Sequence, residues 1–164
     1  MIFAGALFFL AFLLAVLRVL FWDLDTSVSE ITFSYNDGAV SPAYYTEASL
    51  KIVPDYQIRS LNVGYESVYS YRTDETDGVD IDTEGVIGGE YFDRFEGVIG
   101  LLHDDLVETG GTCVGGHNLS YEMVDETGEL SNEQLYLCGD YSEDVEFIRD
   151  FYFDVVGLLT EDTE

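Results

Sequence analysis

Charge is the feature that most constrains this chain: 33 Asp and Glu residues stand against 6 Lys and Arg, which gives a net charge of -27. Ionised carboxylates are almost never fully buried without a partner, so the fold must place nearly all of them in water. Hydrophobic residues still make up 47% of the chain, which is enough for a packed core and argues against a disordered acidic tail. The same charge repels phosphate backbones and argues against nucleic acid as a partner.

Lysine is nearly absent, because Lys51 is the only one in the chain. This depletion, together with the acidic excess, resembles the composition of proteins from halophilic archaea. Carboxylates that repel one another are screened only in concentrated salt, so we expect a halophilic fold that is least stable at low ionic strength. The alternative is an ordinary acidic domain that works at moderate salt.

The first 22 residues form an apolar segment in which Arg18 is the only charged residue. As an α-helix this segment would be about 33 Å long, which matches a hydrocarbon core of about 30 Å. Trp22 suits the interfacial region, and Asp23 ends the segment. The sequence therefore predicts a transmembrane anchor helix over residues 1–22, with the lipid bilayer as its partner, and one acidic soluble domain over residues 23–164. A cleaved signal peptide, a pilin-like assembly helix and a core helix are the alternatives.

The orientation of this anchor rests on few residues. Taken alone, Arg18 favours a cytoplasmic C-terminal side by the positive-inside rule. The two cysteines and an Asn-Leu-Ser sequence point the other way, because disulfides and N-linked glycans form outside the cytoplasm. We therefore expect a single-pass protein of the cell membrane with an extracytoplasmic soluble domain.

Hydrophobic periodicity divides the soluble part into strands and helices. Three runs with a period of two precede an acidic loop; a run with helical spacing, a hairpin and a last helix follow. This β-β-β-α-β-β-α order predicts an α+β fold, in which a small antiparallel sheet with two helices on one face follows the N-terminal transmembrane helix. The predicted strands are 31–35, 48–52, 61–71, 119–123 and 135–137, the loop is 73–90, and the helices are 91–106 and Ser142 or Asp140 to Leu159.

Cys113 and Cys138 enter and leave the predicted hairpin region. An even number of cysteines in an external domain favours a disulfide, which would add about 3 kcal/mol of stability in the chain-entropy model. With His103 and His117 the same cysteines could instead form a Cys2His2 zinc site, although no C-x2-C pair is present. Two unrelated thiols are the third interpretation.

Asp80, Asp82 and Glu84 alternate along the predicted acidic loop and precede Gly85. The pattern partly matches a calcium-binding loop, in which carboxylates at positions 1, 3 and 5 precede a glycine at position 6. The match ends at position 12, where Tyr91 stands in place of the bidentate glutamate. Calcium is therefore the one candidate cofactor, and a solvated acidic loop is the interpretation that the composition favours.

Three further patterns are candidates for sites. Asn118 begins an N-glycosylation sequon, which matters only outside the cytoplasm. His103 beside Asp104 and Asp105 has the residue types of a general base with an orienting carboxylate, but no nucleophile accompanies them, so we expect no catalytic residue there. Seven tyrosines could form an aromatic binding face or pack the core of the sheet: Tyr35, Tyr44, Tyr45, Tyr65, Tyr69, Tyr71 and Tyr91.

The sequence shows no catalytic, cofactor or nucleotide motif. It therefore predicts a non-enzymatic binding or structural domain, such as an accessory subunit that contacts other membrane protein subunits. The alternative class is a cell-surface enzyme or a protease-inhibitor-like domain whose site is assembled only in the fold.

Overall fold

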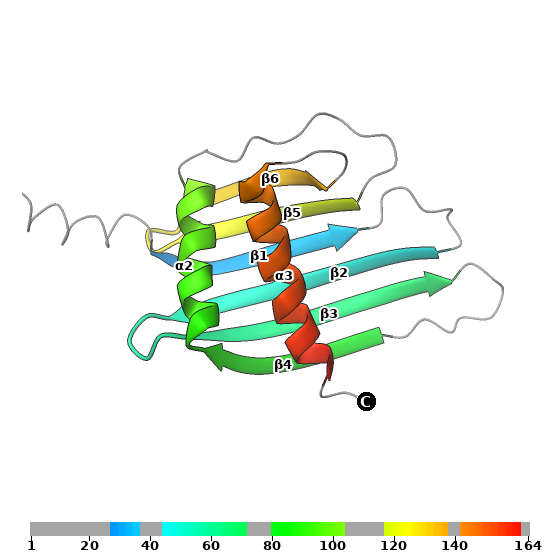
Figure 1. Cartoon of the computed structure of the whole chain (residues 1–164), viewed down its shortest axis with the longest axis horizontal. Helices are drawn as coiled ribbons and strands as arrows, with labels where there is room; N and C mark the ends of the chain where they lie inside the picture. Colours follow the sequence, from blue (N-terminus) through cyan, green and yellow to red (C-terminus); the bar gives the residue numbers. More distant parts are fainter. Residues whose placement is uncertain (1–26, 37–43, 72–79, 104–116, 138–141, 162–164) are drawn as a thin grey trace, which may run out of the picture.

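The computed structural model describes residues 27–36, 44–71, 80–103, 117–137 and 142–161. They form one six-stranded antiparallel sheet in the order β4-β3-β2-β1-β5-β6, with both helices on the same face (Figure 1). The chain runs outward from the central strand β1 to the edge strand β4, and β5 then pairs with the other side of β1. The elements are β1 Val28–Asn36, β2 Tyr44–Asp55, β3 Ser60–Tyr71, β4 Asp80–Gly88, α2 Glu90–His103, β5 His117–Asp125, β6 Leu130–Leu137 and α3 Glu143–Glu161.

The helix-covered face of the sheet is apolar in every strand, and the strand register brings its side chains into rows. Phe33 of β1 lies opposite Leu50 of β2 and Tyr121 of β5, and all three are buried. A slip of one residue would turn each of them toward water, so hydrophobic alternation fixes the register. The core residues of the sheet are Val28, Ile31, Phe33, Ala48, Leu50, Ile52, Leu61, Val63, Tyr65, Leu119, Tyr121, Met123, Leu135 and Leu137.

The two helices cross the strands and bury their apolar stripes on the sheet (Figure 1). With 14 residues, α2 is about 21 Å long, close to the width of about 24 Å that six strands span. Gly89 precedes it with a φ of 64°, which glycine adopts without strain, and its carbonyl accepts hydrogen bonds from the Phe92 and Asp93 amides. Before α3, the Ser142 hydroxyl accepts a hydrogen bond from the Val145 amide at 3.3 Å. This N-cap confirms one of the two predicted starts.

The predicted order β-β-β-α-β-β-α is wrong by one strand, because Asp80–Gly88 forms the edge strand β4 instead of an acidic loop. Ile81 and Ile87 pack against the core, whereas Asp82 and Glu84 are exposed on the opposite face. The period of two is therefore present, but two carboxylates in its polar half give it the composition of a loop. Charged side chains on an edge strand also discourage pairing between molecules, which suits this position.

The N-terminal transmembrane helix of the predicted architecture has no counterpart in the described part of the chain. Within it, neither α2 nor α3 combines the length and the apolar character needed to cross a bilayer. Residues 1–22 themselves lie outside the described residues. The architecture is accordingly corrected to a two-layer domain of six strands and two helices.

Candidate functional site

The sheet surface that faces away from both helices, here called the open face, presents small uncharged side chains at its centre. Ser34 of β1 pairs with Ser49 of β2 and with Ser120 of β5, so three serines lie side by side across the middle strands. The Ser120 hydroxyl donates to the Ser34 carbonyl at 3.4 Å. Toward the β4 edge the same row continues with Glu66 and Asp82. The row is therefore uncharged in the middle and acidic at one side.

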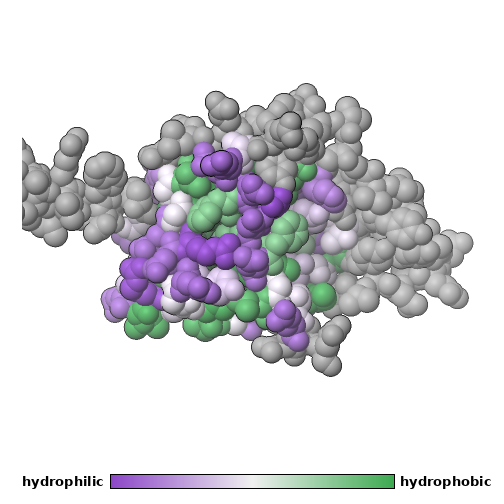
Figure 2. All heavy atoms as spheres, viewed as in Figure 1, coloured by the Kyte–Doolittle hydropathy of each residue, from purple (hydrophilic) through white to green (hydrophobic). Residues whose placement is uncertain are grey.

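The opposite surface has a different character. Figure 2 shows the helix-covered face, where hydrophilic residues form a band with apolar residues visible on either side. Residues of the two helices also form ion pairs: Arg94 pairs with Asp154 at 2.7 Å, and Arg149 pairs with Glu146 at 3.3 Å. The two surfaces of the domain therefore offer a partner different chemistry.

One end of the open face carries a row of branched aliphatic side chains. Val53 pairs with Asn62, which in turn pairs with Val86, and on the far side of β1 Val124 pairs with Leu130. Val86 is 67% exposed and Leu130 is 56% exposed. Aliphatic residues from four strands thus lie at one end of the open face without joining the core, with Glu30 of β1 and Asn62 of β3 between them.

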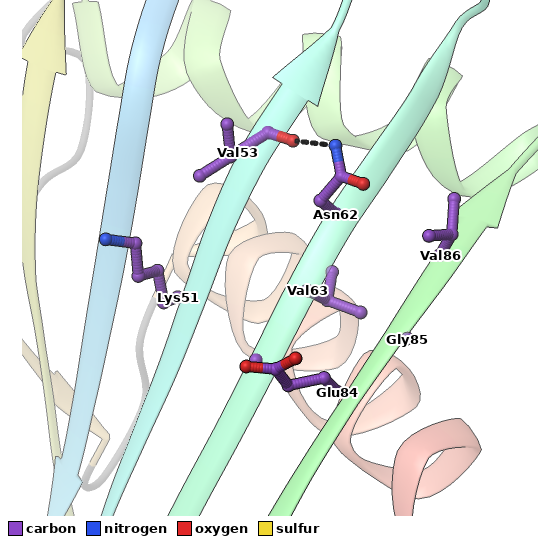
Figure 3. Close-up of a pocket in the computed structure, with 8 residues that line it drawn as sticks. Lys51, Val53, Asn62, Val63, Glu84, Gly85 and Val86 are labelled. Atoms are coloured by element: carbon purple, nitrogen blue, oxygen red, sulfur yellow. Dashed lines mark hydrogen bonds between the residues drawn. The ribbon is translucent and has the colours of Figure 1, made fainter.

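Between β2, β3 and β4 the open face is hollowed to a volume of about 410 Å³. Gly64, which has no side chain, forms the floor of this hollow, and the strand register places Lys51 and Glu84 beside it in one cross-strand row. Figure 3 shows Lys51 and Glu84 with the other labelled lining residues. Val53 and Val86 bound its end. The lining residues are Lys51, Val53, Asn62, Val63, Gly64, Glu84, Gly85 and Val86.

Gly64 is the unexpected residue of the hollow, because neither its backbone nor its neighbours require glycine. Among the described residues only Gly89, Gly128 and the non-glycine Arg59 have a positive φ. A Cβ built on Gly64 would lie 4.0 Å from Glu84 Cγ, which is an ordinary contact. Glycine inside a strand weakens it and often marks a place where a ligand or another chain approaches closely.

Gly85 in the next strand provides the contrast. Its Cβ would point to the helix-covered side and lie 3.0 Å from Leu159 Cδ2 of α3. This glycine is explained by packing, because it lets the end of the helix approach the edge strand. Of the two glycines that line the hollow, only Gly64 lacks a structural reason.

Substitutions at these two glycines should change stability in opposite directions. Gly64→Thr is expected to raise the free energy of unfolding by about 0.5–1 kcal/mol, because threonine favours strands and a Cβ here makes only an ordinary contact of 4.0 Å with Glu84 Cγ. Gly85→Val should lower it by about 1–3 kcal/mol through overpacking against Leu159. Urea unfolding of the full-length variants measures both. A loss of stability in Gly64→Thr as large as in Gly85→Val would show that the fold itself needs the hollow.

The charges around the hollow are unevenly matched. Lys51 Nζ lies 2.7 Å from Glu30 Oε2 and is turned toward β1, whereas the Glu84 side chain extends across β3 (Figure 3). No ion pair of Glu84 occurs among the described residues. The Asn62 side-chain amide donates to the Val53 carbonyl at 3.3 Å. The hollow therefore offers a carboxylate whose charge is not matched, and the arrangement suits a cation better than an anion.

The predicted calcium ligands are not assembled into a loop. Asp82 and Glu84 lie two residues apart on the open face of β4, and successive residues on one face of a strand are about 6.8 Å apart. The side chain of Asp80 lies outside the described residues. Within the described ranges, no three His, Cys, Asp or Glu side chains are grouped to hold a metal ion. Calcium binding stays a prediction.

Cys113 and Cys138 both lie outside the described residues, and no disulfide occurs within them. His103 ends α2 and is exposed, and Asp104 and Asp105 next to it also lie outside the described residues. His117 begins β5, where its Nδ1 lies 2.7 Å from the Tyr35 hydroxyl. The disulfide and zinc hypotheses therefore stay predictions.

Asn118 lies on β5, and its side-chain amide donates to the Asn36 side-chain carbonyl at 3.1 Å. The sequon is thus in a paired strand and Asn118 is half-buried, while glycosylation itself stays a prediction. Tyr65 belongs to the core, and Tyr35 and Tyr91 pack against it, which confirms the core interpretation for these three. The side chains of the other four tyrosines lie outside the described residues: Tyr44, Tyr45, Tyr69 and Tyr71.

Comparison with known proteins gives no relative from which a function could be carried over: no protein-family model, curated protein or solved structure matches this chain. The functional argument therefore rests on the open face and its hollow. Sequence reasoning missed both, although the lone glycine at position 64 inside a strand pattern was a visible signal.

Proposed function

We propose that this protein is a non-enzymatic binding domain that docks a basic protein partner on the open face of its sheet. We further propose that its apolar N-terminal sequence attaches it to the cell membrane with the domain outside. The observation that carries the docking proposal is the open face itself, a broad sheet surface with an uncharged centre, an aliphatic row and a hollow.

The composition of the open face supports docking. Protein interfaces are depleted of charge at their centre and polar at their rim. In a chain with 33 acidic residues, the row Ser49-Ser34-Ser120 across the middle strands carries no charge, and Glu47, Lys51 and Glu122 lie in the rows on either side of it. Six strands about 24 Å wide and about 24 Å long give a surface of roughly 600 Å² before side-chain relief. This area is of the same order of magnitude as the roughly 800 Å² of surface that each partner of a stable complex buries.

The net charge defines the kind of partner. At -27 the chain attracts basic surfaces and repels acidic ones, at contact distance in concentrated salt and from farther away at low salt. On the open face of β3 and β4, Glu66, Asp82 and Glu84 continue this field up to the hollow. A protein with arginine or lysine on its contact surface fits these charges.

The support for membrane attachment is the amino-acid sequence of residues 1–22, with Arg18 as its one charge. The described domain begins at Ser27, next to the aliphatic end of the open face, where Glu30 pairs with Val124. A partner in or near the same membrane would meet this end of the sheet. Docking on the open face and attachment to the membrane together describe an accessory subunit of a membrane complex.

Two arginine substitutions on opposite faces of the domain test the docking proposal, and each adds one positive charge to the chain. Ser120→Arg places a positive charge at the centre of the open face, and Leu158→Arg places one on the outer surface of α3, where Leu158 is 37% exposed. Tagged full-length chains are expressed in the native host and recovered with bound proteins in mild detergent. Because juxtaposed like charges cost several kcal/mol, Ser120→Arg should reduce partner recovery at least about tenfold.

Leu158→Arg is the matched control and should leave recovery unchanged. Equal recovery with both variants, or a loss confined to Leu158→Arg, would contradict docking on the open face. Melting curves of both variants test whether each domain is folded.

A further inference from the structure

We infer that the hollow over Gly64 receives one basic side chain, arginine or lysine, from the docked partner. The inference rests on the proposed function and assigns a specific role to one part of the open face. Three features of the hollow lead to it: its floor, its walls and its unmatched carboxylate.

The floor and walls suit the stem of a long side chain. Gly64 carries no side chain, and a Cβ built on it would meet only Glu84 Cγ, at 4.0 Å, so a guest can lie against the backbone of β3 beside the Glu84 side chain. Val53 and Val86 bound one end of the hollow with apolar surface. Arginine and lysine bury their methylene stems against such surface while the charged group reaches a polar one.

The polar part of the hollow supplies acceptors. The Glu84 side chain extends across β3 (Figure 3), with its Cγ 4.0 Å from a Cβ built on Gly64, and its carboxylate has no ion pair among the described residues. The amide nitrogen of Asn62 donates to the Val53 carbonyl, which leaves its Oδ1 as a second acceptor facing β4 (Figure 3). Lys51 does not compete for Glu84, because its ammonium group pairs with Glu30 at 2.7 Å. A guanidinium group has several donors and is suited to two such acceptors.

An anionic guest fits less well. The single cation of the hollow is already paired with Glu30, and Glu84 would repel a carboxylate or phosphate. A purely apolar guest would leave Glu84 and Asn62 without partners under it, which costs free energy when polar groups are desolvated. The guest that satisfies both parts of the hollow is a long side chain with a positive end.

The test uses isotope-labelled full-length protein in detergent micelles and two blocked tripeptides, acetyl-Val-Arg-Val-amide and acetyl-Val-Gln-Val-amide. Chemical shifts of backbone amides in β2, β3 and β4 report binding. The arginine peptide should shift the amides of Gly64, Glu84 and Val86, and the glutamine peptide should bind at least about tenfold more weakly. Equal binding of the two peptides would overturn the inference, as would an arginine peptide that does not bind at tens of millimolar.

Three variants separate a specific hollow from general attraction to a polyanion. Glu84→Gln and Gly64→Thr should each lower the affinity for the arginine peptide about tenfold or more. Asp82→Asn removes the same charge from the same face of β4 but outside the hollow, and should change affinity less than about twofold. An equal loss in Glu84→Gln and Asp82→Asn would show that only net charge matters and would end the inference.

Partner recovery distinguishes this inference from the proposed function. If Gly64→Thr and Glu84→Gln retain the membrane partner while Ser120→Arg loses it, docking on the open face stands and the hollow has no role in it. If all three retain the partner, the open face is not the docking surface. We expect all three variants, Gly64→Thr, Glu84→Gln and Ser120→Arg, to lose the partner.

Discussion

In 1 M NaCl the full-length chain is expected to melt about 10 °C higher than in 10 mM NaCl, because the screening length falls from about 30 Å to about 3 Å over this range. With 33 acidic residues against 6 basic ones, we expect repulsion between carboxylates to be the largest electrostatic contribution to the free energy of unfolding. For a chain of this size about 1 kcal/mol moves the melting temperature by about 2–4 °C, so the expected shift corresponds to about 3 kcal/mol.

Salt also screens attraction, but the structure indicates that little attraction is available to lose. The four basic residues of the described part are all paired at the surface, and exposed pairs contribute only about 0–1 kcal/mol each. Against them, Glu66 of β3 lies directly opposite Asp82 of β4, and like charges in such cross-strand pairs destabilise a sheet. The pairs are Lys51–Glu30, Arg59–Asp93, Arg59–Glu96, Arg94–Asp154, Arg149–Glu146 and Arg149–Asp150.

Two controls identify the source of the salt effect. Glu66→Gln should raise the melting temperature in 10 mM NaCl and make little difference in 1 M NaCl, because it relieves one repulsive pair. A few millimolar CaCl2 should raise the melting temperature no more than NaCl of the same ionic strength does. A larger rise would indicate that the predicted site at Asp80, Asp82 and Glu84 binds calcium. A melting temperature that does not depend on NaCl would refute the halophilic interpretation.

Replacement of Tyr152 by phenylalanine is expected to stabilise the protein by about 1–3 kcal/mol at neutral pH. Tyr152 of α3 is 1% exposed and packs on Phe33 and Tyr35, yet its hydroxyl has no hydrogen-bond partner among the described residues. A buried hydroxyl that has lost its water without a replacement destabilises the folded state. Tyr152→Phe keeps the ring and removes only this group, and chemical unfolding of the full-length variant measures the gain.

The same residue predicts how stability depends on alkaline pH. Burial, and then the nearby Tyr65 and Tyr35 side chains, raise the pKa of Tyr152 well above its ordinary value of 10.0. The folded chain therefore keeps this proton while the unfolded chain releases it, and stability falls as the pH rises above about 10. Tyr152→Phe removes this contribution, so its advantage over the natural chain should grow above pH 10.

Tyr56→Phe is the matched control at neutral pH. The Tyr56 hydroxyl accepts a hydrogen bond from the Val28 amide at 3.0 Å, so the same substitution should here cost about 0.5–1.5 kcal/mol. If Tyr152→Phe also destabilises the protein, the Tyr152 hydroxyl has a partner outside the described residues.

Much of this fold could be predicted from the sequence, because its apolar residues follow simple periods. Strands β1, β2 and β3, the β5–β6 hairpin and both helices agree with the alternation and helical spacing, and Ser142 caps α3 as one of two predicted candidates. The strand β4 was mistaken for a loop because Asp82 and Glu84 dominate its polar positions. Its pairing with β3 is a long-range property, set by Ile81 and Ile87 on the core side.

The candidate site was harder to predict, because its residues have no distinctive chemistry in isolation. Lys51, Gly64 and Glu84 lie 13 and 20 positions apart in the chain and become neighbours only through the register of three strands. Residue types of familiar chemistry, such as Cys113, Cys138 and His103, drew the prediction elsewhere.

Photo-cross-linking from defined positions tests the docking surface most directly. A photoreactive amino acid is placed at Ser49 or Ser120 on the open face, and at Phe147 or Leu158 on the outer surface of α3, in the full-length chain in its native membrane. Docking on the open face predicts a cross-linked partner from Ser49 and Ser120 and none from the two helix positions. Cross-links from Phe147 and Leu158, with none from the two serines, would contradict it.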